Sequence, residues 1–269
     1  MIDKDIHDRL RQEYNPDGSQ LRLIQLRLLE MLKFIDQVCR KYDIPYWLSS
    51  GTCLGAVRHG GFIPWDDDVD IEMLDDDYKK FLTVIGAECN NRYVMHCHET
   101  DPMYLRPFGK LRDLNSEIKE NCKADYYNKY HGLYIDIFPL KESSSELVSK
   151  LGGILLKYIA FGIPMLYWGK VSKYILSRIG WAVIKTYERL AYIIELPLKN
   201  RYLRHKYPNY YHFVRIQEDI FPLKEIQFEN GNFFVPGNVD GYLSKIYGDY
   251  NQLPGKEEIN YHIKNVEVR

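Results

Sequence analysis

The stretch FIPWDDDVDIEM, residues 62–73, places four aspartates and one glutamate within seven positions, beside the apolar side chains of Trp65, Val69 and Ile71. Carboxylates repel one another. Holding several of them against apolar groups costs free energy unless a cation or a shared proton offsets the repulsion. The stretch is therefore either a solvated acidic turn or a metal site.

Charged and apolar residues alternate in DVDIEM, residues 68–73, which is typical of a half-buried strand. Residues two apart on a strand share a face, so we expect Asp68 and Asp70 to project together. Asp66 joins them if the strand begins early. Two carboxylates on one strand edge suit Mg²⁺ or Mn²⁺, whose remaining positions are filled by water and substrate phosphates.

The residues just upstream favour a phosphate site over a simple acidic turn. SSGT, residues 49–52, lies between a predicted strand and a predicted short helix, where backbone N–H groups can hold a phosphate. Gly51 allows the main chain to approach closely, and Thr52 offers a hydroxyl. Arg58 and Lys110 are further candidates for phosphate binding, with ordinary surface charge as the alternative.

Asp136 is the candidate for a third carboxylate. It stands alone in the apolar stretch GLYIDIFPL, residues 132–140, where an unpaired aspartate is expensive. It either completes the acidic site, as a metal ligand or a proton acceptor, or it caps a turn or pairs with an arginine.

The hydrophobic periodicity predicts an α+β fold, a mixed sheet flanked by helices and interrupted by a helical insertion. Residues 20–42 read as an amphipathic helix, and residues 44–140 as a compact mixed unit of strands and helices. Residues 142–206 read as two or three helices, and the chain then returns to strands and turns before a helix from about Val239. We therefore predict a catalytic core with an N-terminal helix (1–140), an insertion (141–206) and the C-terminal part of the catalytic domain (207–269).

The bulk composition excludes several classes of protein. The chain has 269 residues, of which 45% are hydrophobic and 27% charged, so it is globular. A net charge of −1 predicts no binding to nucleic acid through bulk electrostatics. The chain has five cysteines, an odd number, and their spacings are irregular. This pattern predicts a reduced, cytoplasmic location.

The insertion is rich in Leu, Ile, Tyr and Trp with interspersed Lys and Arg. Its longest uncharged stretch, residues 158–169, is too short to span a bilayer. A helical subdomain packed on the core is the favoured interpretation. The alternative is peripheral contact with the inner face of a membrane, with Trp168 and Trp181 at the interface.

Three segments together resemble the LicD family: YWLSSGTCLGAVRHGGFIPWDDDVDIEM (46–73), GLYIDIFPL (132–140) and VPGNVDGYLSKIYGDYNQLP (235–254). Relatives of that family include fukutin-related protein and other members of the nucleotidyltransferase-fold superfamily. The resemblance extends from about residue 20 to about residue 255, with residues 142–206 matching only as a variable helical insert.

The resemblance implies a nucleotidyltransferase-like fold and a metal-dependent phosphotransferase. Such enzymes move a phospho-alcohol, often phosphocholine, from a CDP-linked donor to a sugar hydroxyl, and CMP leaves. The acceptor is a surface glycan or its lipid-linked precursor, as in lipopolysaccharide, teichoic acid or capsule synthesis. The alcohol stays open among choline, ribitol, glycerol and a sugar phosphate.

Carried over by position, the resemblance makes Asp68 and Asp70 metal ligands with Asp66 as a helper. Asp136 becomes the third carboxylate, and Gly51 and Thr52 contact the donor phosphates. Two other functions share these features: transfer of the nucleotide itself, with release of pyrophosphate, and glycan binding by a protein with a vestigial site.

Overall fold

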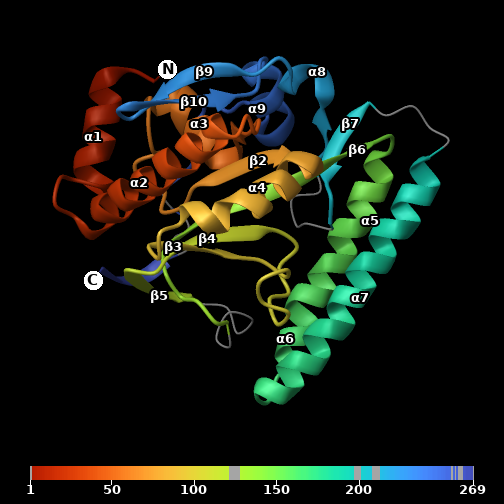
Figure 1. Ribbon diagram of the computed structural model, residues 1–269. Coiled ribbons are helices and arrows are strands. Elements are labelled where there is room, and N and C mark those ends of the chain that lie inside the picture. The colour runs from red at the N-terminus through yellow and green to blue at the C-terminus, as the bar shows by residue number, and fades with distance from the viewer. Residues whose placement is uncertain are drawn as a thin grey trace.

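The fold rests on one mixed sheet with helices packed against it, as a computed structural model of the chain shows (Figure 1). The structure describes residues 2–120, 128–196, 201–207, 213–255, 257, 259 and 263–268. The predicted α+β class is confirmed.

Seven strands form the central sheet. Five follow the order β1 (Trp47–Leu48), β2 (Asp70–Leu74), β6 (Tyr134–Ser143), β4 (Gly109–Asp113) and β3 (Tyr93–His96). The long β6 also pairs, near its end, with β7 (Tyr202–His205), which pairs in turn with β8 (Arg215–Ile216). β2 and β6 run parallel, and the other pairs in this sheet are antiparallel.

Helices α2 (Gln20–Lys41) and α4 (Asp75–Glu88) pack against each other and against strands of this sheet. The hydroxyl of Ser19 caps α2 by accepting from the Arg22 N–H at 3.2 Å. Three aspartates occupy the first turn of α4, where the helix dipole favours negative charge. The apolar stripes of both helices fill the main core.

A second group of elements covers the strand edge formed by β1. Helix α3 (Ser50–His59) contacts α9 (Val239–Tyr247) and the hairpin of β9 (Lys224–Phe228) and β10 (Gly231–Val235). Gly60, at φ +67°, ends α3 in the left-handed conformation that glycine adopts without strain. The short helix α8 (Gln217–Ile220) leads from β8 into this group.

The predicted insertion is a helical hairpin that leans away from the sheet (Figure 1). It consists of α5 (Glu146–Lys157), the π-helical turn η1 (Tyr158–Gly162), the short α6 (Ile163–Met165) and the long α7 (Lys170–Glu195). A small separate core, which includes Leu156, Trp181 and Ile184, joins it to the main body. Among the described residues, no helix is both long and apolar enough to cross a membrane.

Most predicted elements are confirmed, including the helix at 20–42, the strand–helix unit at 46–60 and the final helix from Val239. β2 begins later than expected, at Asp70, so Asp68 lies in the segment that leads into the strand. The central sheet also takes in β7, which falls inside the range predicted as the insertion.

The elements that were not predicted include α1 (Lys4–Tyr14), strand β7, the short helix α8, and β5 (Ser116–Glu120) with its partner β11 (Ile263–Val268). The β5–β11 pairing joins segments more than 140 residues apart, which no local pattern reveals. Cys39, Cys53, Cys89 and Cys97 are free and buried, whereas Cys122 lies outside the described residues.

Candidate active site

Two of the predicted aspartates stand side by side on neighbouring strands. Asp70 on β2 is the register partner of Asp136 on β6, and the Asp136 N–H donates to the Val69 carbonyl at 3.0 Å. Adjacent strands lie about 4.8 Å apart, and register partners project to the same face of the sheet. The structure therefore brings together two carboxylates that are 66 positions apart in the sequence.

Asp66 and Asp68 complete the acidic group from the segment before β2. Burial, and then the charge of Asp68, raises the pKa of Asp66 well above its usual range. Burial also raises the pKa of Asp70, helped by the charges of Asp68, Asp136 and Asp66. The neighbouring carboxylates thus oppose the ionisation of Asp66 and Asp70, and a bound cation relieves this repulsion.

Asp66, Asp68 and Asp70 line a pocket of about 580 Å³. Asp66 faces the start of α3, because a Cβ added at Gly51 would lie 3.1 Å from Asp66 Oδ2. Ser50 and Gly51, the first two residues of α3, line the same pocket, with Ser50 held at φ +46°. The predicted meeting of a helix N-terminus with an acidic strand edge therefore occurs at one pocket.

Thr52 has a different contact from the one expected. Its hydroxyl accepts a hydrogen bond from the Asp70 N–H at 2.9 Å, and its side chain is buried. Thr52 is absent from the residues that line the pocket. It ties the first turn of α3 to the start of β2 and so fixes the position of Asp70.

The two predicted cations lie in different surroundings. Arg58 lines the pocket, where its Nη1 donates to the carbonyls of Tyr250 and Gln252 at 3.0 and 3.2 Å. Lys110 is buried on β4, with its ammonium 2.8 Å from Asp136 Oδ1 and 3.0 Å from the centre of the Tyr134 ring. Lys110 thus contacts the acidic group itself and holds Asp136 in place.

The far wall of the pocket comes from the C-terminal segment, for which no role was predicted residue by residue. Tyr247, Asp249 and Tyr250 line it, together with Phe213 and Arg215 from the segment that contains β8. The signal was present in the sequence, because the stretch 235–254 carries part of the family resemblance. Only the fold shows that it returns to the start of α3.

A buried ionic network underlies this wall. Glu72, two residues after Asp70 on β2, pairs with Arg215 and accepts from Trp47 Nε1 at 2.9 Å. The Tyr242 hydroxyl of α9 lies 3.3 Å from Glu72 and also contacts Ser49 Oγ at 3.0 Å. The sequence pattern places Glu72 in the acidic stretch and gives it no role of its own, whereas in the structure it holds the pocket walls together.

The donor set fits a divalent cation in type. Asp66, Asp68 and Asp70 in the pocket wall, with Asp136 beside Asp70 on the neighbouring strand, supply the hard oxygen ligands that Mg²⁺ or Mn²⁺ takes. In the arrangement that the described residues adopt, no three of the Asp, Glu, His and Cys side chains form a ready-made ligand group. Binding therefore requires carboxylates that are already neighbours to turn towards a common point.

Comparison with known proteins identifies the domain. Residues 43–151 match the model of the LicD/FKTN/FKRP nucleotidyltransferase domain. They form a LicD-family domain. The predicted resemblance is thereby confirmed. The matched range includes β1, α3, β2, β6 and the segment before β2, and it therefore contains all four aspartates.

Named relatives extend this similarity. The chain is 29% identical over 260 residues to the lipopolysaccharide cholinephosphotransferase LicD of Haemophilus influenzae, covering 90% of this chain and 95% of that protein. It is 29% identical over 123 residues to the ribitol-5-phosphate transferase FKTN of Mus musculus, which is 44% of this chain and 24% of that protein. A match of 38% over 64 residues to human FKRP, a ribitol 5-phosphate transferase, covers 24% of this chain and 13% of that protein.

Proposed function

We propose that this LicD-family protein is a phosphotransferase that moves a phospho-alcohol from a CDP-linked donor to a sugar hydroxyl of a glycan. The observation that carries the proposal is the convergence of Asp66, Asp68, Asp70 and Asp136 beside a pocket that also holds the first turn of α3. The relatives support it, since each of the three is named a transferase of a phosphorylated alcohol.

Phosphocholine is the leading candidate for the group transferred. The cholinephosphotransferase LicD is similar along nearly its whole length, whereas the ribitol-phosphate transferases match only over a quarter or less of theirs. By the same similarity, the proposed acceptor is a lipopolysaccharide-type glycan or its lipid-linked precursor.

The pocket suits a nucleotide-linked donor. Its volume of about 580 Å³ falls in the range of small-molecule sites. The N–H groups at the start of α3, with Arg58 and Arg215, would face the donor phosphates. The rings of Tyr247 and Tyr250 offer apolar faces for the cytosine base.

Asp68, Asp70 and Asp136, with Asp66 as a helper, would hold a Mg²⁺ or Mn²⁺ ion. The bound ion would offset the charge of the donor phosphates and of the departing CMP. The acceptor hydroxyl would give its proton to Asp136, form the new O–P bond and displace CMP, whose O–P bond to the donor phosphorus breaks. Lys110 would keep Asp136 oriented throughout.

The product of the reaction tests the proposal. We expect the protein, incubated with CDP-choline, Mg²⁺ and a lipopolysaccharide acceptor, to release CMP and to label the glycan. Parallel reactions with CDP-ribitol and CDP-glycerol show which phospho-alcohol is transferred fastest. Release of phosphocholine in place of CMP, with CMP joined to the glycan, would contradict the proposal and indicate nucleotide transfer.

Asp136→Asn is the decisive variant. Loss of a ligand or base that acts in the transition state lowers the rate on the order of a thousandfold. Asp76→Asn is the matched control, because Asp76 is an exposed aspartate on α4 whose partner is Lys79. Turnover of Asp136→Asn near that of the control would contradict the role of Asp136.

A further inference from the structure

Helix α7 exposes most of its apolar side chains to solvent. Trp181, Ile184 and Ala191 are apolar side chains that it buries, and the other buried residues are the small or polar Ser172, Lys173, Ser177, Gly180 and Glu195. The side chains that it exposes include Val171, Tyr174, Ile175, Ile179, Val183, Leu190, Tyr192, Ile193 and Ile194. A helix of a soluble protein normally shows the reverse pattern.

The exposed apolar surface continues across the rest of the hairpin. On α5, Leu147, Leu151 and Ile154 are exposed at helical spacing. Around the turn, Tyr158, Met165, Leu166 and Trp168 are exposed, Trp168 to 82%. So many exposed apolar side chains on two helices that contact each other indicate an interaction site.

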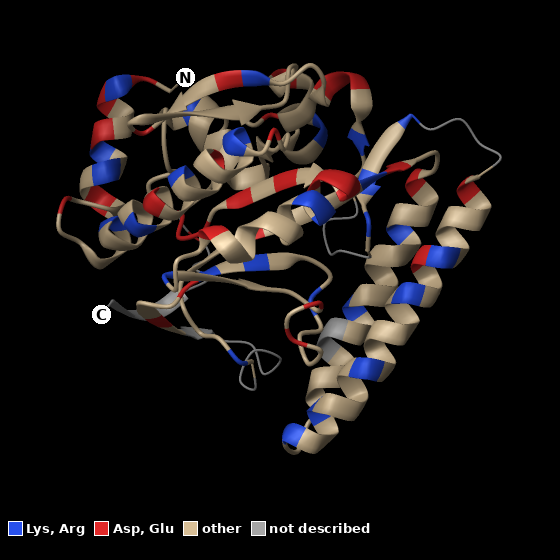
Figure 2. Cartoon of the chain, in the orientation of Figure 1, with Lys and Arg blue, Asp and Glu red and all other residues tan. Residues whose placement is uncertain are grey.

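The charge on the hairpin has one sign. Residues 147–187 contain six basic residues, Lys150, Lys157, Lys170, Lys173, Arg178 and Lys185, and no acidic residue, although the whole chain has a net charge of −1. Figure 2 shows the far end of the hairpin carrying only basic residues, with acidic ones near the body. Lys150, Lys157, Lys170 and Arg178 are exposed.

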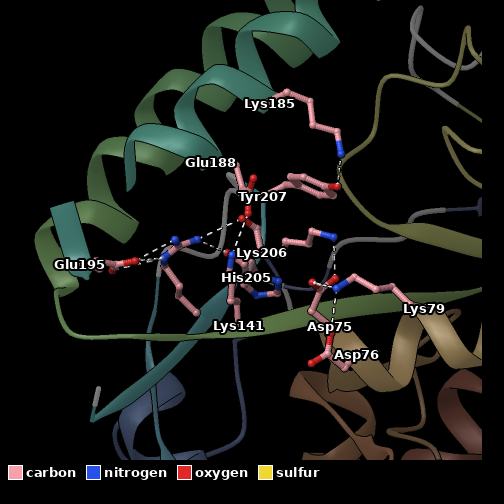
Figure 3. Close-up of polar contacts among 11 residues, drawn as sticks. Asp75, Asp76, Lys79, Lys141, Lys185, Glu188, Glu195, His205, Lys206 and Tyr207 are labelled. Carbon is pink, nitrogen blue, oxygen red and sulfur yellow. Dashed lines mark hydrogen bonds and ion pairs between the residues drawn. The ribbon is translucent and has the colours of Figure 1, made fainter. Parts of the chain in front are cut away.

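Ion pairs hold the base of the hairpin to the body, as Figure 3 shows for Glu188 and Glu195. Glu188 pairs with Lys141 of β6 at 2.9 Å, and Glu195 pairs with Arg204 of β7 at 2.9 Å. Both acidic residues of α7 are thus paired with basic residues of the protein body. The free end of the hairpin presents apolar and basic side chains together.

We infer that this hairpin is a docking surface for an anionic lipid bilayer. The apolar ridge would enter the boundary between headgroups and acyl chains, and the flanking Lys and Arg would contact the lipid phosphates. The described helices cannot span a bilayer, so the hairpin lies in the interface. The inference goes beyond the proposed transfer reaction and does not depend on it.

The positive charge of the hairpin favours an anionic bilayer over a second copy of this chain as its partner. Two hairpins packed face to face would bring together two surfaces that each expose Lys150, Lys157, Lys170 and Arg178, with no acidic residue between 147 and 187. That juxtaposition is repulsive, whereas a bilayer of anionic lipid supplies the opposite charge. An apolar surface with only cations beside it therefore fits a membrane best.

Vesicle flotation tests the inference with the full chain. We expect the protein to float with vesicles that contain phosphatidylglycerol and to bind pure phosphatidylcholine vesicles much more weakly, with binding that falls as salt rises. Failure to bind the anionic vesicles would overturn the inference.

Two sets of substitutions separate the apolar and the basic contributions. Lys157→Gln, Lys170→Gln and Arg178→Gln together should weaken binding by about fivefold per charge, on the order of a hundredfold in all. Met165→Ser, Trp168→Ser and Val171→Ser together should weaken it on both kinds of vesicle. Leu23→Ser with Leu114→Ser is the matched control, because both leucines are exposed outside the hairpin, and it should bind as the wild type does.

Light scattering tests whether a second copy of this chain, and not a bilayer, covers the apolar surface of the hairpin. A stable dimer that the apolar variant converts to monomers would overturn the inference and assign the surface to a second copy. A protein that is monomeric in solution both before and after the substitutions would support it.

Discussion

At the scale of single residues, the acidic group shows which site residues the chemistry of the side chains predicts from the sequence. Asp68, Asp70 and Asp136 were selected because carboxylates beside apolar strands are costly, and the structure places Asp136 in register with Asp70. Thr52 was expected to contact phosphate, yet its hydroxyl accepts from the Asp70 N–H. A hydrogen bond from one element to the next depends on the angle between them, which the sequence does not contain.

Thr52→Val tests this positioning role. The substitution keeps the shape of the side chain but removes the acceptor for the buried Asp70 N–H, so Asp70 loses its fixed position. We expect transfer activity to fall by about 10- to 100-fold with the fold retained, measured as kcat and by circular dichroism.

Thr52→Ser supplies the control, because serine restores the hydroxyl. Recovery of most of the activity in Thr52→Ser is expected. Equal losses in the serine and valine variants would show that the methyl group and its packing matter, and not the hydrogen bond.

At the scale of elements, the site depends on how α9 and β8 meet β2. Glu72, Arg215 and Tyr242 come from these three elements, and the first two are almost completely buried as an ion pair. The elements themselves were largely predictable, because β2, α4 and α9 have clear periodicity, α4 has three aspartates in its first turn, and Asn238 caps α9. The closing of the pocket by α9 was not predictable, since it joins residues 170 positions apart.

Glu72→Gln should destabilise the protein strongly. It leaves the Arg215 guanidinium buried without its counter-charge, which costs about 3–5 kcal/mol of unfolding free energy. Urea denaturation measures the loss.

Glu225→Gln is the control for this change, because Glu225 pairs with Arg40 at the surface, where such pairs contribute about 0–1 kcal/mol. If Glu72→Gln were no more destabilising than Glu225→Gln, the buried pair would not be holding the pocket walls.

At the scale of the whole molecule, buried neutral histidines are spread through the body of the protein. Burial, and next the charge of Arg58, lowers the pKa of His59 to about 3. Burial lowers the pKa of His96 to about 4, and burial also places the pKa of His205 well below its usual range. The insertion was predictable as helices, but its exposed apolar face was not, because composition does not show which stripe faces the body.

These histidines predict a loss of stability in mild acid. In the unfolded chain they bind protons below about pH 6.5, whereas in the native protein they do not. Stability therefore rises with pH in this window and falls as pH drops from about 6.5 towards 4, by about 2 kcal/mol for His59 at pH 5. Urea denaturation at pH 7 and pH 5 measures the difference.

His59→Gln should reduce that difference, because glutamine does not titrate and can accept the hydrogen bond that Arg58 Nε gives at 3.0 Å. A pH dependence of stability that is the same in His59→Gln and in the wild type would contradict the assignment of His59 as a buried neutral group.

The central claim is that Asp68, Asp70 and Asp136 together hold a divalent cation, and a titration with Mn²⁺ tests it most directly. The electron paramagnetic resonance signal of free Mn²⁺ reports binding, with and without CDP-choline, independently of activity. We predict saturable binding by the wild type and by Asp76→Asn, and affinity at least tenfold weaker in Asp70→Asn and in Asp136→Asn. Equal binding of Mn²⁺ by all four proteins would contradict the account.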